Sequence, residues 1–152
     1  MEERAVTNST CLIGLERRYQ TELLPQVFTT VFAPPMVVTE IRSYLGWLRV
    51  QPVQNTAIIA NLKTQMDPGE AETIALALEL ENVTLILDDK KARRVALEKG
   101  LRVTGTLGIL LRAKSLGVIN EIKPLLDELL QADFRLSDRL IKEALKRAGE
   151  ES

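Results

Sequence analysis

The sequence has little of the residue types on which many catalytic and metal-binding sites depend. Its 152 residues contain no histidine and a single cysteine, Cys11. These absences exclude a Ser-His-Asp triad, a Cys-His nucleophile pair, a haem held by histidine and zinc sites of the Cys/His kind. An intrachain disulfide is excluded as well, which fits a reducing compartment. Chemistry at neutral pH must therefore come from carboxylates, Lys, Arg, Ser, Thr or Tyr.

An excess of charge of either sign and long apolar runs are also missing. Twenty basic residues face 21 acidic ones, so that no global basic field indicates nucleic-acid binding. No apolar run approaches the roughly 18–20 residues that a membrane span needs. The first ten residues, MEERAVTNST, lack the apolar stretch of a signal peptide. We therefore expect a cytoplasmic protein with no membrane partner.

The remaining composition, 45% hydrophobic and 27% charged, is that of an ordinary globular protein. The length predicts a single domain over residues 1–152. Apolar residues in Glu70–Leu80 recur at helical spacing, and Val83–Leu87 (VTLIL) is typical of a strand buried on both faces of a parallel sheet. Gly100 is suited to end the helix before it.

Strands and helices alternate along the chain, which predicts an α/β sandwich with a small parallel sheet. The predicted strands are Ala5–Thr7, Thr29–Ala33, Val50–Val53, Val83–Leu87 and Leu101–Val103. The predicted helices are Leu12–Arg18, Met36–Leu48 with Pro35 near its first position, Thr56–Thr64, Glu70–Leu80, Lys90–Lys99, Thr106–Ser115, Ile122–Gln131 and Ser137–Ala148.

Polar residues follow the predicted strands, at the edge where open parallel sheets bind ligands. If the sheet is parallel they converge, and three or four oxygen ligands there would bind a hard cation such as Mg²⁺. Such an ion can polarise a phosphoryl oxygen and activate a water without any histidine. The candidates are Asn8, Glu40, Glu70, Asp88, Asp89, Thr104 and Thr106.

Each candidate also has a purely structural interpretation. Asp67, Pro68 and Glu70 resemble a capping box, and Asp88 or Asp89 could N-cap the following helix. Glu40 could lie on a solvated face. The turn Thr104–Thr106 could hold a phosphate on its free N–H groups or simply cap a helix. The basic run from Lys90 to Arg94 either grips phosphates or is solvated.

Four stretches together resemble PIN domains, and more closely a bacterial and archaeal branch related to VapC-type toxins. The resemblance extends over roughly Ala5 to Gly149. It implies a three-layer α/β/α sandwich, and a Mg²⁺- or Mn²⁺-dependent endoribonuclease activity found in many members. It also implies a homodimer and, for a toxin, a small antitoxin partner. The four stretches are VTNSTCLIGL, APPMVVTEI, MDPGEAETIALALEL and VTLILDDKKARRVALEKGLRVTGTLGILLRAKSLGVI.

The resemblance also assigns roles to single residues. Asn8 stands where PIN domains usually have their first Asp, Glu40 matches the acid after the second strand, and Thr104 or Thr106 supports the site. Glu70 matches the third acid, with Glu72 as competitor, and Asp88 the last, with Asp89 as neighbour. Lys90, Arg93, Thr104 and Thr106 are the candidate nucleic-acid contacts.

Two departures from the family pattern bear on activity. Asn8 is neutral, and an amide oxygen is a poorer metal ligand than a carboxylate. Many PIN toxins also carry Ser or Thr two residues before the last acid, where this chain has Ile86, or Leu87 if Asp89 is the match. Both departures predict weaker metal binding and slow or lost catalysis.

Three functional hypotheses follow. In the first, Glu40, Glu70 and Asp88 hold Mg²⁺ or Mn²⁺ for RNA cleavage and Asn8 orients a water or the scissile phosphate. In the second, the chain is a non-catalytic nucleic-acid-binding or protein-interaction module. In the third, the acids only cap helices of a dimerising scaffold, and Leu45, Trp47 and Leu48 are either an exposed apolar patch or core.

Overall fold

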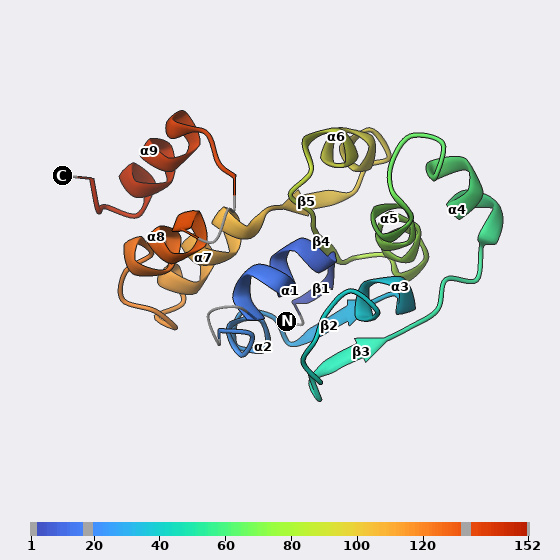
Figure 1. The fold of residues 1–152 in the computed structure, drawn as a ribbon, viewed down its shortest axis with the longest axis horizontal. Coiled ribbons are helices and arrows are strands. Elements are labelled where there is room, and N and C mark those ends of the chain that lie inside the picture. The colour runs from blue at the N-terminus through green and yellow to red at the C-terminus, as the bar shows by residue number, and fades with distance from the viewer. Residues whose placement is uncertain (1–2, 17–19, 132–134, 152) are drawn as a thin grey trace.

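The fold is built around a parallel β-sheet. A computed structural model describes residues 3–16, 20–131 and 135–151. Within these ranges, five strands form a sheet in the order β3-β2-β1-β4-β5, and every neighbouring pair is parallel (Figure 1). The strands are β1 (Arg4–Thr7), β2 (Thr30–Ala33), β3 (Leu48–Val50), β4 (Thr84–Ile86) and β5 (Arg102–Thr104).

Successive residues of the central strands enter two different hydrophobic cores, because side chains alternate across a strand. Ala5, Val31 and Ile86 belong to the core on one face of the sheet. Their neighbours Val6, Phe32 and Leu85 belong to the core on the other face. The strands are apolar on both sides, as expected for a parallel sheet that helices cover on both faces.

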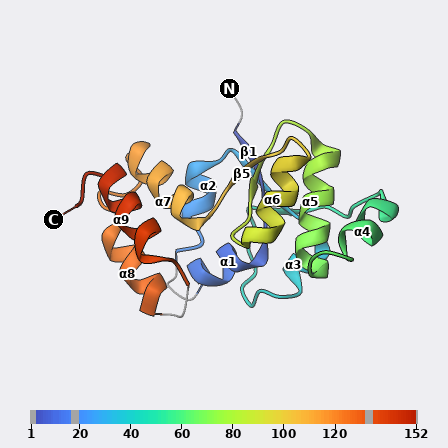
Figure 2. The same cartoon turned by 90° about the horizontal axis from the view of Figure 1, so that it is seen from above.

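Helices form the two outer layers (Figures 1 and 2). The first core takes buried residues from α1, α2, α3, α7, α8 and α9, and the second from α4, α5 and α6. The short α3 packs against α5. The helices are α1 (Ser9–Glu16), α2 (Leu23–Val27), α3 (Pro35–Val38), α4 (Thr56–Leu62), α5 (Pro68–Leu80), α6 (Lys90–Glu98), α7 (Thr106–Ser115), α8 (Lys123–Gln131) and α9 (Asp138–Arg147).

The predicted fold class, a three-layer α/β/α sandwich around a small parallel sheet, is confirmed. The predicted helix Thr106–Ser115 has the predicted bounds, and Gly100 follows α6 at a φ of +80°, which favours glycine. Strand register pairs Thr7 with Ile86 and Ile86 with Thr104. The residues after these strands therefore emerge side by side at one edge of the sheet, which we call the carboxyl edge.

The predicted long helix Met36–Leu48 is wrong, because α3 ends at Val38 and Leu48 already begins β3. The Thr39 hydroxyl donates to the Met36 carbonyl at 2.6 Å, a local bond that competes with helix continuation. Further along, the Glu16 carboxylate accepts the backbone N–H groups of Arg42 and Ser43. A tertiary contact therefore holds this segment in an irregular conformation.

Two further differences concern local structure. The strand predicted at Val50–Val53 lies two to three residues earlier, at Leu48–Val50, and α2, whose short apolar pattern Pro25 interrupts, is not among the predicted helices. Arg17 and Arg18, at the end of the first predicted helix, lie outside the described residues. Leu45, Trp47 and Leu48 are partly buried against the core rather than forming an exposed patch.

The C-terminal helices are fastened to α7 by one carboxylate. Glu150 follows α9 and accepts hydrogen bonds from Lys114 Nζ at 2.9 Å and from the Ile122 and Lys123 N–H groups at 2.8 and 2.9 Å. Lys114 also donates to the Ala148 carbonyl. These donors hold the pKa of Glu150 below its usual value although its burial opposes them. The contacts fix α9 beside α7, on the side of the molecule away from β3 (Figure 1).

Candidate active site at the carboxyl edge of the sheet

Asn8 begins the candidate site directly after β1. Its backbone N–H donates to the Ile86 carbonyl at 3.2 Å, which holds the ends of β1 and β4 together. Its side chain is 3% exposed, and its Oδ1 accepts the Cys11 N–H at 3.3 Å. The amide oxygen therefore already supports the first turn of α1, as an N-cap residue does.

Asp88 follows β4 and is held by Thr106, the first residue of α7. Asp88 Oδ1 accepts the Thr106 backbone N–H at 2.8 Å, and Oδ2 accepts the Thr106 hydroxyl at 2.7 Å. Burial raises the pKa of Asp88, whereas both Thr106 hydrogen bonds and the nearby Arg93 guanidinium oppose this rise. The carboxylate is thus fixed in one orientation before any ligand binds.

Gly105 allows this arrangement by having no side chain. A Cβ at this position would lie 2.6 Å from Arg93 Nη1 and 2.8 Å from Asp88 Oδ1. Arg93 also donates to the Leu87 carbonyl at 3.4 Å. The arginine of α6, the aspartate after β4 and the glycine after β5 therefore meet at one point of the carboxyl edge.

A second group of acids lies at the start of α5. Asp67 caps this helix, because its Oδ1 accepts the Glu70 N–H at 2.8 Å. Glu40 approaches the same turn, since a Cβ on Gly69 would lie 2.8 Å from Glu40 Oε1 and 3.5 Å from Asp67 Oδ1. Glu40, Asp67 and Glu70 are thereby gathered around one helix N-terminus, although Glu40 follows a different element.

Glu70 is the most perturbed acid of this group. Its pKa is raised to about 7, first by burial and then by the negative charges of Asp67 and Asp89. Asp89 is the N-cap of α6, where its Oδ2 accepts the Ala92 N–H at 2.9 Å. The charge of Asp89 therefore links the α5 acids to the strand end that also carries Asp88.

A groove extends from Asp88 toward α9. It has a volume of about 1080 Å³, and its lining comes from the start of α6, the end of β5, α7 and α9. We call it the α6–α9 groove. Asp88, Lys90, Arg93, Thr104 and Gly105 line the end of it that adjoins the carboxyl edge.

One family model, that of the PIN domain, matches residues 4–150 of the chain. The chain belongs to the PIN-domain family. PIN domains have a nuclease-type fold and generally use divalent metal ions. No curated protein matches the chain. In the described part of this PIN domain, no helix is long and apolar enough to cross a membrane.

The PIN-domain acids predicted from sequence lie at one edge of the sheet but in two groups. Glu40 and Glu70 meet at α5, whereas Asp88 is held by Thr106 and Asp89 caps α6. Among the residues that the structure describes, no three Asp, Glu or Cys side chains are close enough together to hold one metal ion. The structure thus brings the predicted residues to one edge without gathering them around a single point.

Of the predicted nucleic-acid contacts, Lys90, Arg93 and Thr104 line the α6–α9 groove of this PIN domain, and Thr106 binds Asp88 beside it. Glu72 lies two residues beyond Glu70 on α5 and is half-buried. Cys11 is fully buried, with its pKa raised to about 12 by burial and by the charge of Asp88. It is a core residue.

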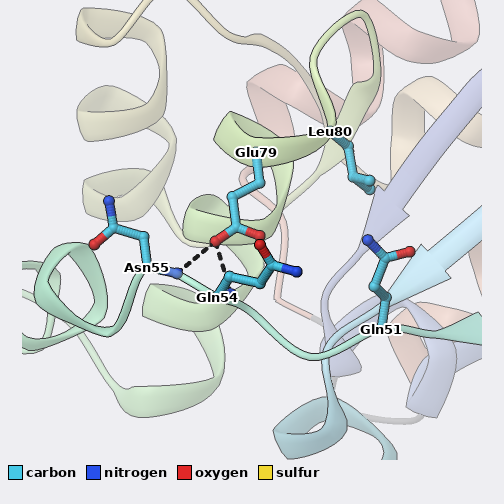
Figure 3. A pocket seen from close by; sticks show the side chains of 5 residues that line it. All are labelled: Gln51, Gln54, Asn55, Glu79 and Leu80. Carbon is cyan, nitrogen blue, oxygen red and sulfur yellow. Dashed lines mark hydrogen bonds between the residues drawn. The ribbon is translucent and has the colours of Figure 1, made fainter.

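A smaller hollow of about 500 Å³ lies elsewhere in the PIN domain, beside α4 and α5, and is lined by Gln51, Gln54, Asn55, Glu79 and Leu80 (Figure 3). Glu79 Oε1 accepts the N–H groups of Gln54 and Asn55 at 2.8 and 2.7 Å. These bonds fasten the start of α4 to α5. The polar residues of this hollow therefore have a structural role, which is to join α4 to α5.

Sequence reasoning missed two contributors to the site. Asp67 was interpreted only as a helix cap, yet its charge also raises the pKa of Glu70. The basic residues that α9 adds to the groove, Arg139 and Arg147, follow the nearest candidate site acid, Asp89, by 50 residues or more, and no local pattern connects them to it. The amphipathic pattern of α9 predicts a helix but not which neighbour it faces.

Proposed function

We propose that this PIN domain is a Mg²⁺- or Mn²⁺-dependent endoribonuclease that cleaves RNA phosphodiester bonds. The observation that carries the proposal is the crowding of carboxylates at the carboxyl edge, where Glu70 has a pKa of about 7 beside Asp67 and Asp89. Mutual repulsion of this kind is relieved by a bound cation. We further propose RNA as the substrate, a homodimer as the assembly and a small antitoxin as a possible protein partner.

The residues at this edge fit a hard divalent cation by their chemistry. All of them offer oxygen, which Mg²⁺ and Mn²⁺ prefer over nitrogen and sulfur. Because the two groups of acids lie apart among the described residues, they would have to move closer for Glu40, Glu70, Asp88 and Asp89 to hold one ion, to which Asn8 would contribute its amide oxygen. The like-charge repulsion around Glu70 supports this assignment, because a cation there would replace the proton that Glu70 holds near neutral pH.

When bound, a divalent cation polarises a phosphoryl oxygen and activates a water for in-line attack. The remaining requirements fall to the chain itself. Thr106 keeps both oxygens of Asp88 in place through its N–H and hydroxyl groups. Arg93, beside Asp88, is placed to counter the negative charge of a phosphate.

A second candidate function is favoured by the state of Asn8. Its Oδ1 is engaged by the Cys11 N–H, and a neutral amide replaces the first carboxylate of the family pattern. These observations favour a PIN domain that binds nucleic acid without cleaving it. The two candidates differ in whether Mn²⁺ binds and whether Asp88 is needed for turnover.

The test of the first candidate is Asp88→Asn, assayed for Mn²⁺-dependent cleavage of a mixed panel of RNAs. The amide keeps the shape of the carboxylate and can still accept the Thr106 N–H. We expect cleavage to fall about a hundredfold or more, because several kcal/mol of charge stabilisation are lost. Asp127→Asn, on the exposed face of α8, is the matched control and should cleave like the unchanged protein.

Melting temperatures of both variants show whether a loss reflects chemistry rather than unfolding. Equal activity of Asp88→Asn and the unchanged chain would contradict the ribonuclease proposal. If the unchanged chain neither cleaves RNA nor produces a calorimetric signal with millimolar Mn²⁺, the non-catalytic candidate is the correct one.

A further inference from the structure

The α6–α9 groove is strongly cationic although the chain as a whole has a net charge of −1. Its described lining contains two carboxylates, Asp88 and Glu143, against five cations. Such a local excess attracts polyanions. The five cations are Lys90, Arg93, Arg112, Arg139 and Arg147.

Not all of these cations are equally available to a ligand. Arg112 forms an ion pair with Glu3 at 3.1 Å and lies over the Phe28 ring, and Arg93 donates to a backbone carbonyl. Arg139 and Arg147 are exposed and form no ion pair with any residue in the described ranges. Lys90 is also exposed and has no ion pair among the described residues, so Lys90 and the two α9 arginines are the cations most free to bind an anion.

Part of the groove lining is apolar. Leu107 and Leu111 of α7 and Leu140 of α9 line it, and Leu140 is 47% exposed. A single nucleic-acid strand offers both phosphates for the arginines and unpaired bases for the leucines, whereas a duplex keeps its bases inside. The described lining contains no aromatic residue, so that bases would lie on it with little preference for sequence.

The groove is continuous with the candidate active site, since Asp88 belongs to its lining. We infer that the α6–α9 groove binds a single nucleic-acid strand that leads to the carboxyl edge, with Arg139 and Arg147 contacting its phosphates. This inference rests on the proposed function for the place where the strand is cut. Binding in the groove needs no metal and can be measured by itself.

The experiment measures fluorescence anisotropy of a labelled 12-nucleotide RNA of mixed sequence with the full chain, in EDTA. Arg139→Gln/Arg147→Gln is compared with Lys142→Gln/Lys146→Gln, which removes the same charge from the same helix at exposed positions outside the groove. We expect the arginine pair to weaken binding roughly fivefold to tenfold and the lysine pair less than about twofold. The slope of log K against log salt should become shallower by about 1.4 in the arginine pair.

A third variant gains affinity and so cannot be explained by misfolding. Glu143→Gln removes one of the two carboxylates of the groove and should tighten RNA binding about twofold to threefold. A duplex of the same sequence should bind more weakly than the single strand at equal salt.

Three outcomes would overturn the inference. The first is an equal loss in the arginine and lysine pairs, and the second is absence of RNA binding by the unchanged chain. The third is that replacing Arg139 and Arg147 abolishes binding of an acidic amphipathic peptide but leaves RNA binding unchanged. This result would assign the groove to a protein partner. Cleavage measured in parallel with Mn²⁺ keeps these results separate from the proposed nuclease activity, which depends on Asp88.

Discussion

The two acidic groups at the carboxyl edge differ in whether their surroundings stabilise the charged carboxylate. Asp88 is partly buried beside α7 and receives two hydrogen bonds from Thr106, with Arg93 close by. Glu70, at the start of α5, is surrounded instead by the negative charges of Asp67 and Asp89. One carboxylate is fixed by donors, whereas the other is raised in free energy by its neighbours.

The difference indicates a division of labour within the proposed site. A carboxylate that is already oriented loses little entropy when a ligand arrives, which favours accurate positioning. A group of crowded carboxylates gains most from a cation, because binding removes their repulsion. The Asp88 side would therefore determine geometry, and the Glu70 side would supply most of the electrostatic attraction for the metal.

The largest difference between the two acidic groups is expected when a methyl group is added at the glycine beside each of them. Gly105→Ala places a Cβ 2.8 Å from Asp88 Oδ1, which is already held by Thr106, and 2.6 Å from Arg93 Nη1. We expect a loss of about 2–3 kcal/mol in unfolding free energy, as for other overpacked sites, and a large loss of Mn²⁺-dependent cleavage. Thermal or urea unfolding and the RNA cleavage assay measure the two effects.

Gly69→Ala is the counterpart on the Glu70 side. Its Cβ would lie 2.8 Å from the far end of the exposed Glu40 side chain and at an ordinary 3.5 Å from Asp67 Oδ1, and the added methyl favours the helix. Stability should therefore stay within about 1 kcal/mol of the unchanged chain. Gly46→Ala, in a loop where the nearest atom is 3.8 Å away, is a neutral control. Equal costs at Gly105 and Gly69 would contradict the proposed difference in rigidity.

A smaller effect is expected from Thr106→Val, which deletes the hydroxyl donor and keeps the shape of the side chain. Asp88 Oδ2 loses its 2.7 Å hydrogen bond in a buried position, which should cost about 1–2 kcal/mol. The pKa of Asp88 should rise further, because a bond that favours its charged form is gone. The acid limb of the cleavage-against-pH profile should therefore move to higher pH.

Thr106→Ser keeps the hydroxyl and should restore the pH profile even if it loses some packing. A Thr106→Val variant whose stability falls while its pH profile stays unchanged would show that the hydroxyl has a structural role only.

Much of the fold follows from local pattern. VTLIL is apolar on both faces, and the bounds of α7 follow from its leucine spacing and from the turn before it. The Met36–Leu48 segment could not be predicted in the same way. The segment does not continue as a helix, because Glu16, more than 20 residues away, accepts the backbone N–H groups of Arg42 and Ser43. Local helix propensity does not report such a contact.

The acids of the site were also named from sequence, but their grouping was not. Alternation of strands and helices places Asn8, Asp88 and Thr106 at one edge. Whether Asp88 or Asp89 caps a helix depends on side-chain orientation, and here Asp89 caps α6 while Asp88 binds Thr106. The cationic groove depends on how α9 packs against α7, a contact between segments whose separate patterns fit several neighbours.

The last and smallest effect concerns Glu70 and sharpens the comparison through pH. Its pKa is raised from an ordinary 4.5 to about 7 in the folded chain, so the folded state holds this proton more tightly than the unfolded state. Its contribution to stability is therefore complete below about pH 4.5 and is lost as pH rises toward 7. Without metal, Glu70→Gln should flatten the plot of unfolding free energy against pH in this range, whereas Glu72→Gln should leave that plot unchanged.

Mn²⁺ should reverse the trend, because deprotonated carboxylates bind the ion and the folded state alone presents them together. Added Mn²⁺ should raise the melting temperature at pH 7.5 more than at pH 5, and Glu70→Gln should lose most of this gain. If Glu72→Gln loses the gain and Glu70→Gln keeps it, then Glu72 is the third acid and the repulsion around Glu70 serves only the helix. If neither variant changes the response, the metal does not bind on the α5 side, and the crowding of its carboxylates is a cost that the fold carries without a ligand.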